Sequence, residues 1–124
     1  MFRLMVAVSL LLAAGLAGCG RDDVAAAPND FGGDPEQGRI LVTKYSCGSC
    51  HDIPGVAGAH GLVGPPLEHM GERTMVAGVL PNTPENLTRW IEQPQSVVPG
   101  NAMPDMGINN HDARDVAAYL YTLR

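Results

Sequence analysis

Two cysteines and a histidine lie within five consecutive residues, in the order Cys47-Gly48-Ser49-Cys50-His51. This arrangement suits covalent haem attachment, because two thiols one helical turn apart can add to the vinyl groups on one porphyrin edge while the adjacent imidazole binds the iron. Two thioether bonds and one axial ligand would make the cofactor part of the fold. We therefore predict one covalent haem c, attached at Cys47 and Cys50 and ligated by His51.

Two other kinds of site use a Cys-x-x-Cys pair. Thiol–disulfide redox proteins use it, and Cys-Gly-x-Cys is common in thioredoxin-like proteins, where the pair follows a buried strand. Here the segment before Cys47 has a helical pattern. A zinc site would need two further ligands, usually a second Cys-x-x-Cys or a histidine pair, and the sequence has neither at such spacing. Haem attachment is favoured, with thiol redox chemistry as the main alternative.

The first residues have the pattern of an export signal. Arg3 precedes the apolar run Leu4–Ala17, which is short for a dedicated membrane span. The run closes on Leu16-Ala17-Gly18-Cys19, which resembles the lipobox of bacterial lipoproteins, in which the cysteine is acylated. An ordinary signal cut nearby, leaving a stray thiol, is the alternative. We predict a lipoprotein signal peptide at 1–18 and lipidation of Cys19, which also gives the third cysteine a role.

The rest of the chain divides into a tether and one domain. Residues 19–33 are rich in Asp, Ala, Gly and Pro, which predicts a lipidated N-terminus and a flexible tether. Residues 34–124 form a domain whose few aromatic residues give a thin core, and a buried macrocycle would complete it. The signal and anchor predict a place in the bacterial cell envelope, with the domain on the periplasmic or extracytoplasmic side.

The net charge of the chain limits the classes of partner that it can bind. The formal net charge is −5, and Lys44 is the single lysine in the sequence. An acidic chain is a poor ligand for nucleic acid, so we expect none to bind. Docking onto an acidic partner through a ring of lysines is also disfavoured.

Caps and apolar positions predict an all-α fold with three main helices and long loops. Asp34-Pro35-Glu36 and Thr83-Pro84-Glu85 are typical helix starts, each with a capping residue and a proline in the first turn. The last helix is predicted over His111–Leu123. Residues 52–72 and 95–110 are predicted loops, and no strand pairs are expected. The helix faces expected to be apolar are Ile40, Leu41, Lys44 and Tyr45 in the first helix, Leu87, Trp90 and Ile91 in the second, which Pro94 ends, and Val116, Ala117, Leu120 and Leu123 in the third.

The second axial ligand decides between an electron carrier and a catalyst. Thioether sulfur is a soft ligand that favours ferrous iron and raises the reduction potential. Met103 lies in a loop stiffened by Pro99 and Pro104, and Met106 is its close rival. Met70 and Met75 are expected to pack in the core. The remaining histidines are expected on solvent-facing loops or helix caps: His60, His69 and His111.

Over residues 34–124 the sequence resembles class I c-type cytochromes with one haem. The motifs that carry this resemblance are Gly33-Asp34-Pro35-Glu36-Gln37-Gly38-Arg39-Ile40, Cys47–His51, Gly64-Pro65-Pro66-Leu67, Pro99-Gly100-Asn101-Ala102-Met103-Pro104 and Asp115-Val116-Ala117-Ala118-Tyr119-Leu120. A narrower similarity is to the cytochrome domain fused to subunit II of some bacterial haem–copper oxidases. It runs through Gly78-Val79-Leu80-Pro81-Asn82-Thr83-Pro84-Glu85-Asn86-Leu87, Trp90-Ile91 and Pro94-Gln95.

The resemblance implies roles for single residues. His51 would be the proximal ligand and Met103 the distal one, while Pro65 would offer its carbonyl to the other ring nitrogen of the histidine. Trp90 would lie against the haem, or be a core residue, or both. Arg73 would neighbour a haem propionate, or be a surface arginine. Gly38 and Tyr119 would mark the crossing of the first and last helices.

These roles imply a function. With both axial positions filled, a small-molecule substrate has no site at the iron, so the chain would be an electron carrier and not an enzyme. The expected partner is a respiratory membrane complex, a haem–copper oxidase above all. A haem enzyme or gas sensor with an open or displaceable sixth ligand is the alternative.

Overall fold

The computed structural model describes residues 31–124. The predicted signal peptide, Cys19 and residues 19–30 of the predicted tether lie outside the described residues. The first two main helices begin at the predicted caps. Helix α1 spans Pro35–Lys44, and the Asp34 side chain accepts hydrogen bonds from the backbone N–H groups of Glu36 and Gln37. Helix α2 spans Pro84–Glu92 and is capped by Thr83. In both helices the proline stands where no intrahelical donor is needed.

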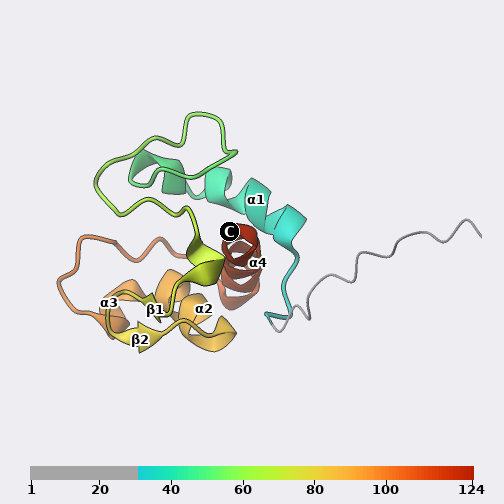
Figure 1. Cartoon of the computed structure of the whole chain (residues 1–124). Coiled ribbons are helices and arrows are strands. Elements are labelled where there is room, and N and C mark those ends of the chain that lie inside the picture. Colours follow the sequence, from blue (N-terminus) through green and yellow to red (C-terminus); the bar gives the residue numbers. More distant parts are fainter. Residues whose placement is uncertain (1–30) are drawn as a thin grey trace, which may run out of the picture.

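The crossing of α1 with the last helix, α4 (Asn110–Thr122), organises the fold (Figure 1). Gly38 makes the crossing possible: a Cβ on it would lie 1.9 Å from the Asp115 carbonyl oxygen and 2.8 Å from the Tyr119 Cβ. The two backbones therefore meet at a position where only a hydrogen fits. Helix α2 packs against α4 as well, so α4 lies between the two earlier helices.

The core is apolar and follows the helix faces that meet at this crossing. The predicted all-α class is confirmed, since helices form the frame. Phe31 is buried, and its ring packs against that of Tyr121 with centroids 4.7 Å apart and planes tilted by 59°. Residues 31–33, assigned to the tether from the sequence, therefore pack on the domain. The buried side chains include Leu41, Val42, Ile53, Met70, Val76, Leu87, Ile91, Ile108, Val116, Ala117 and Leu120.

Three features differ from the sequence predictions. A two-stranded antiparallel hairpin, β1 (Met75–Val76) and β2 (Leu80–Pro81), turns at Ala77-Gly78, where both residues have positive φ. Pro94 opens a short helix, α3 (Pro94–Val97), after α2 has ended at Glu92. Short 3₁₀ turns lie at Cys47–Ser49 and Met70–Glu72.

The predicted apolar face of α1 holds only in part. Leu41 is buried, whereas Ile40 is 54% exposed and the Lys44 side chain is 60% exposed, so both lie off the buried face. The last helix begins at Asn110 and ends at Thr122, one residue earlier at each end than predicted. Among residues 31–124, no helix combines the length and the apolar composition needed to cross a membrane.

Candidate haem-binding site

The cysteine–histidine motif forms a tight turn directly after α1. Ser46 takes a left-handed conformation with φ of 56° and starts a 3₁₀ helix over Cys47–Ser49. The backbone N–H groups of Cys50 and His51 both donate to the Cys47 carbonyl, at 3.2 and 3.0 Å. Side chains three residues apart eclipse in a 3₁₀ turn, so the two thiols project to the same side. Both thiols are free and half-buried.

His51 is held in one tautomer by a backbone carbonyl. Its Nδ1 lies 2.7 Å from the carbonyl oxygen of Pro65. Because a carbonyl can only accept, Nδ1 must carry the proton and donate it. The lone pair is then on Nε2, the nitrogen free to bind a metal.

A glycine-flanked loop packs on the histidine from residues 61 to 64. A Cβ on Gly64 would lie 2.3 Å from the His51 Cε1, and one on Gly61 would lie 2.4 Å from the Cys50 carbonyl carbon. Both glycines also bond to the motif: the Gly64 N–H donates to the Cys50 carbonyl at 2.8 Å, and the Gly61 N–H donates to the carbonyls of Gly48 and His51. The loop therefore fixes the imidazole ring by contact as well as by the Pro65 hydrogen bond.

The electrostatics of Cys47 argue against thiol redox chemistry. Burial raises the pKa of the Cys47 thiol above its ordinary value. A disulfide-exchange site needs the opposite, because the thiolate is the nucleophile and redox cysteines have lowered pKa values. The pair also follows a helix rather than a strand.

Met103 lies in a loop fastened by two side-chain amides. The Gln95 Nε2 donates to the carbonyls of Asn101 and Met103, at 3.0 and 2.8 Å. The Asn101 Oδ1 accepts from the Met103 N–H at 2.7 Å, and its Nδ2 donates to the carbonyls of Pro94 and Val98. Such side-chain bonds to backbone fix the path of a loop that has no secondary structure. The sequence predicted that prolines stiffen this loop, but it did not show that the side chains of Gln95 and Asn101 hold the loop by hydrogen bonds.

The other methionines differ from Met103 in their surroundings. Met70 is buried in the core, as expected, whereas Met75 is 43% exposed on β1 and does not pack there. Met106 is 37% exposed, while Met103 is half-buried. The side chains of His60, His69 and His111 face solvent, as the sequence predicts.

Comparison with known proteins agrees with this site. The sequence model of the family described as "Cytochrome c" matches residues 35–124. The chain belongs to the cytochrome c family. A cytochrome c domain carries electrons on a covalently attached haem c, so haem binding and electron transport are the coarse function of this chain. The motif turn, the Nε2 left free on His51 and the close glycine contacts fit that group.

Individual relatives extend the comparison. The chain is 39% identical to "Cytochrome c oxidase subunit 2" of Alkalihalophilus pseudofirmus over 89 residues, which are 71% of this chain and 25% of the relative. It is 36% identical to the protein of the same name in Bacillus subtilis over 88 residues, 69% of the chain and 25% of the relative. The chain thus spans about a quarter of these oxidase subunits.

A third relative is matched along nearly its full length. The chain is 33% identical to "Cytochrome c2" of Rhodopila globiformis over 104 residues, 74% of the chain and 95% of the relative. No solved structure matches the chain.

Two further residues of this cytochrome c were expected near the haem. Trp90 lies on α2, partly buried, and packs against the apolar core. The Arg73 guanidinium donates to the carbonyl of Pro66 and, at 3.0 Å, to that of Glu68. Arg73 therefore steadies the segment that follows Pro65, the partner of His51.

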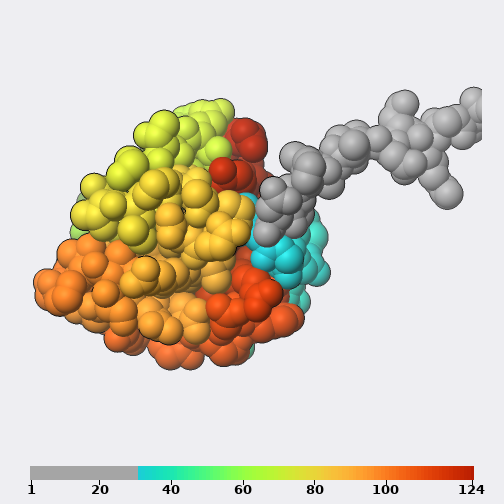
Figure 2. All heavy atoms as spheres, turned by 90° about the horizontal axis from the view of Figure 1, so that it is seen from below, coloured from blue at the N-terminus to red at the C-terminus, as the bar shows by residue number. Residues whose placement is uncertain are grey.

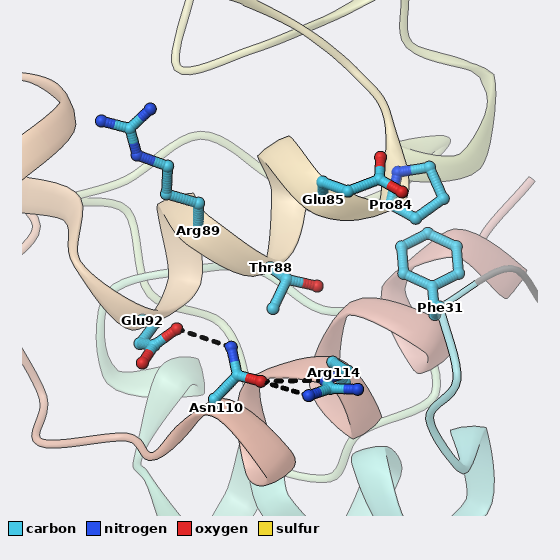
Figure 3. A pocket seen from close by; sticks show the side chains of 8 residues that line it. All are labelled: Phe31, Pro84, Glu85, Thr88, Arg89, Glu92, Asn110 and Arg114. Carbon is cyan, nitrogen blue, oxygen red and sulfur yellow. Dashed lines mark hydrogen bonds between the residues drawn. The ribbon is translucent and has the colours of Figure 1, made fainter.

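A separate open groove of about 310 Å³ lies where α2 meets α4 (Figure 3). Figure 2 shows the face of the molecule on which segments of these two helices lie side by side. The groove contains neither the cysteine–histidine turn nor a methionine. Within it, the Asn110 amide donates to Glu92 at 2.9 Å and accepts from Arg114 at 2.9 Å, so these three side chains are bonded to one another. Its lining residues are Phe31, Pro84, Glu85, Thr88, Arg89, Glu92, Asn110 and Arg114.

Proposed function

We propose that this chain is a membrane-tethered cytochrome c with one haem, carrying single electrons to or within a respiratory haem–copper oxidase. The hydrogen bond from His51 Nδ1 to the Pro65 carbonyl, 2.7 Å long, carries the proposal, because it leaves Nε2 as the proximal ligand. When bound, haem c supplies a one-electron couple. Cys47 and Cys50 would hold it covalently.

Met103 is the proposed distal ligand. Its loop is braced by Gln95 and Asn101, which limits the positions that the thioether can take. A ligand held in place on each side of the iron lets the metal change oxidation state with little rearrangement and leaves no position for a substrate. We infer that the chain is a carrier and not an enzyme. Trp90 would lie against the haem on the distal side, and Arg73 near a propionate.

The proposed partner follows from the relatives. Two of them are named as oxidase subunits, and this chain matches about a quarter of each. A lipid anchor at Cys19 would confine the domain to the membrane that holds such an oxidase and raise its effective concentration there. The anchor would place the domain on the periplasmic or extracytoplasmic side of the bacterial cell envelope.

Paired methionine variants test the carrier function. In Met103→Ala we expect the weak sulfur–iron band of the ferric protein to vanish, cyanide and carbon monoxide to bind readily, and the reduction potential to fall. The haem should remain attached on a denaturing gel. Met106→Ala, three residues further along the same loop, is the matched control and should keep the band.

The result also separates the alternatives. If Met106→Ala loses the band and Met103→Ala keeps it, the distal ligand is Met106 and the carrier function stands. If the wild-type protein itself binds carbon monoxide and neither variant alters its ferric spectrum, the sixth position is open. The chain is then a haem enzyme or gas sensor.

A further inference from the structure

One carboxylate oxygen on α4 is buried without a hydrogen-bond partner. The side chain of Asp115 is only 4% exposed. Its Oδ1 accepts a hydrogen bond from the Asp34 N–H at 2.7 Å, but its Oδ2 has no hydrogen-bond partner. Leaving a buried acceptor unsatisfied costs about 1–3 kcal/mol, and more when the group is charged. A bound ligand at the Asp115 Oδ2 would remove this cost.

The unpartnered oxygen points into a small group of possible metal ligands. His111 stands one helical turn earlier, and its Nδ1 lies 3.6 Å from the Asp115 Oδ2. The same nitrogen lies 3.6 Å from the Asp112 Oδ1. All three ligand atoms lie within 4.8 Å of one another. A distance of 3.6 Å is too long for a hydrogen bond.

The spacing suits a tetrahedral metal ion. Zinc binds imidazole nitrogen and carboxylate oxygen at about 2.0–2.2 Å, which puts neighbouring ligand atoms about 3.4 Å apart. The two distances of 3.6 Å from the His111 Nδ1 are close to this value. Histidine nitrogen and carboxylate oxygen are both zinc ligands, and a water would complete the tetrahedron.

Neighbouring groups orient the second carboxylate. The Tyr45 hydroxyl donates to the Asp112 Oδ2 at 2.7 Å, and the Lys44 Nζ lies 3.4 Å from the same oxygen. These contacts occupy Oδ2 and leave Oδ1 toward His111. The Lys44 ammonium, 3.4 Å from the Asp112 Oδ2, opposes a metal ion here.

We propose that His111, Asp112 and Asp115 bind a zinc-class divalent cation. Two carboxylates and a neutral imidazole carry a charge of −2, which matches such an ion. Asp115 also bonds to the Asp34 backbone, at the cap of α1. The bound ion therefore fastens the start of α4 to the start of α1, away from the cysteine–histidine turn.

Two other histidine–carboxylate pairs on this surface serve as controls. His60 lies 3.1 Å from Asp52, and His69 lies 3.4 Å from Glu72. Both carboxylates are about half exposed, and each site offers two ligands instead of three. Neither carboxylate has a buried oxygen without a partner. Weak, general binding of zinc to surface histidines would involve all three pairs alike.

Titration calorimetry of zinc chloride into the haem-loaded protein tests the site. We expect one tight equivalent, with affinity lowered about tenfold or more in His111→Ala and in Asp115→Asn. His60→Ala and His69→Ala should bind as the wild type does. Lys44→Gln removes the opposing charge and should bind zinc more tightly, which a merely adventitious site would not predict.

The proposal fails on either of two results. A wild-type protein that takes up no zinc below millimolar concentration has no such site. Equal affinities in His111→Ala and the wild type place any bound zinc elsewhere. Because His111 is 84% exposed, its replacement leaves the fold intact, so this variant is decisive even if Asp115→Asn does not fold.

Discussion

Replacing Gly64 by alanine should displace the ring of His51, the proposed proximal ligand, while leaving the histidine itself unchanged. The added Cβ would lie 2.3 Å from the His51 Cε1, 2.7 Å from Nδ1 and 2.9 Å from Nε2. Ordinary contact begins near 3.4 Å, so the ring or the loop must shift by about 1 Å. The backbone of Gly64 has no positive φ, so the new side chain causes no conformational strain of its own.

The size of the effect follows from the contacts that must give way. Forcing an extra methyl group into a packed site costs about 1–3 kcal/mol, and loss of the 2.7 Å bond from Nδ1 to the Pro65 carbonyl adds about 1 kcal/mol. For a domain of this size, each kcal/mol lowers the unfolding temperature by roughly 4–8 °C. The variant Gly64→Ala should therefore melt well below the wild type, with a changed ferric spectrum.

Thermal unfolding of the haem-loaded protein, followed by circular dichroism and by haem absorbance, measures both effects. Val63→Ala is the control, because the Val63 side chain is exposed beside the same glycine and should change neither. If Gly64→Ala melts with the control and keeps the wild-type spectrum, the loop does not pack on the imidazole ring. The account of how His51 is positioned would then be wrong.

Three further predictions concern other parts of the chain. Gly38→Ala should lower the free energy of unfolding in denaturant by at least about 1 kcal/mol relative to Gln37→Ala, because its Cβ would lie 1.9 Å from a backbone oxygen of α4. The gain of about 1 kcal/mol in helix propensity cannot offset such a clash. Equal stability of the two variants would contradict the close crossing. Tyr45→Phe should weaken the dependence of stability on acid pH. The pKa of Asp112 is lowered first by the Tyr45 hydroxyl, which stabilises the fold above about pH 4, and this contribution is lost as the pH falls through the lowered pKa. Plots of stability against pH that run parallel for variant and wild type from pH 6 to pH 3 would count against it. Cys19→Ser should move the haem protein from membranes to the soluble fraction, and a variant that stays on membranes, with no acyl chain on the wild type by mass spectrometry, would remove the anchor.

Local chemistry made much of the fold predictable. The helix starts at Asp34-Pro35 and Thr83-Pro84 depend on capping side chains and a missing N–H within one turn, so neighbouring residues suffice to find them. The cysteine–histidine motif is likewise contiguous, and Pro65 was found through the family resemblance. The structure then shows which nitrogen of His51 the Pro65 carbonyl binds.

The missed features depend on contacts that are distant or weak in the sequence. Strands of two residues, such as Met75–Val76, are too short to show alternation. Pro94 ends one helix and begins another, and the sequence shows only that a helix must break there. The hydrogen bonds of Gln95 with Asn101 and Met103 join residues six and eight positions apart across a loop. Such a loop has no periodic sequence pattern from which its path could be predicted.

The crossing of α1 and α4 also fixes the order in which the chain can fold. The bond from Asp34 to Asp115 joins residues 81 positions apart, so closing it requires nearly the whole domain and loses about 4 kcal/mol of chain entropy. Contacts of such long range form late and slow the folding of small domains. Since α4 follows the other helices along the chain, residues 47–51 are synthesised well before the crossing of α1 and α4 can form.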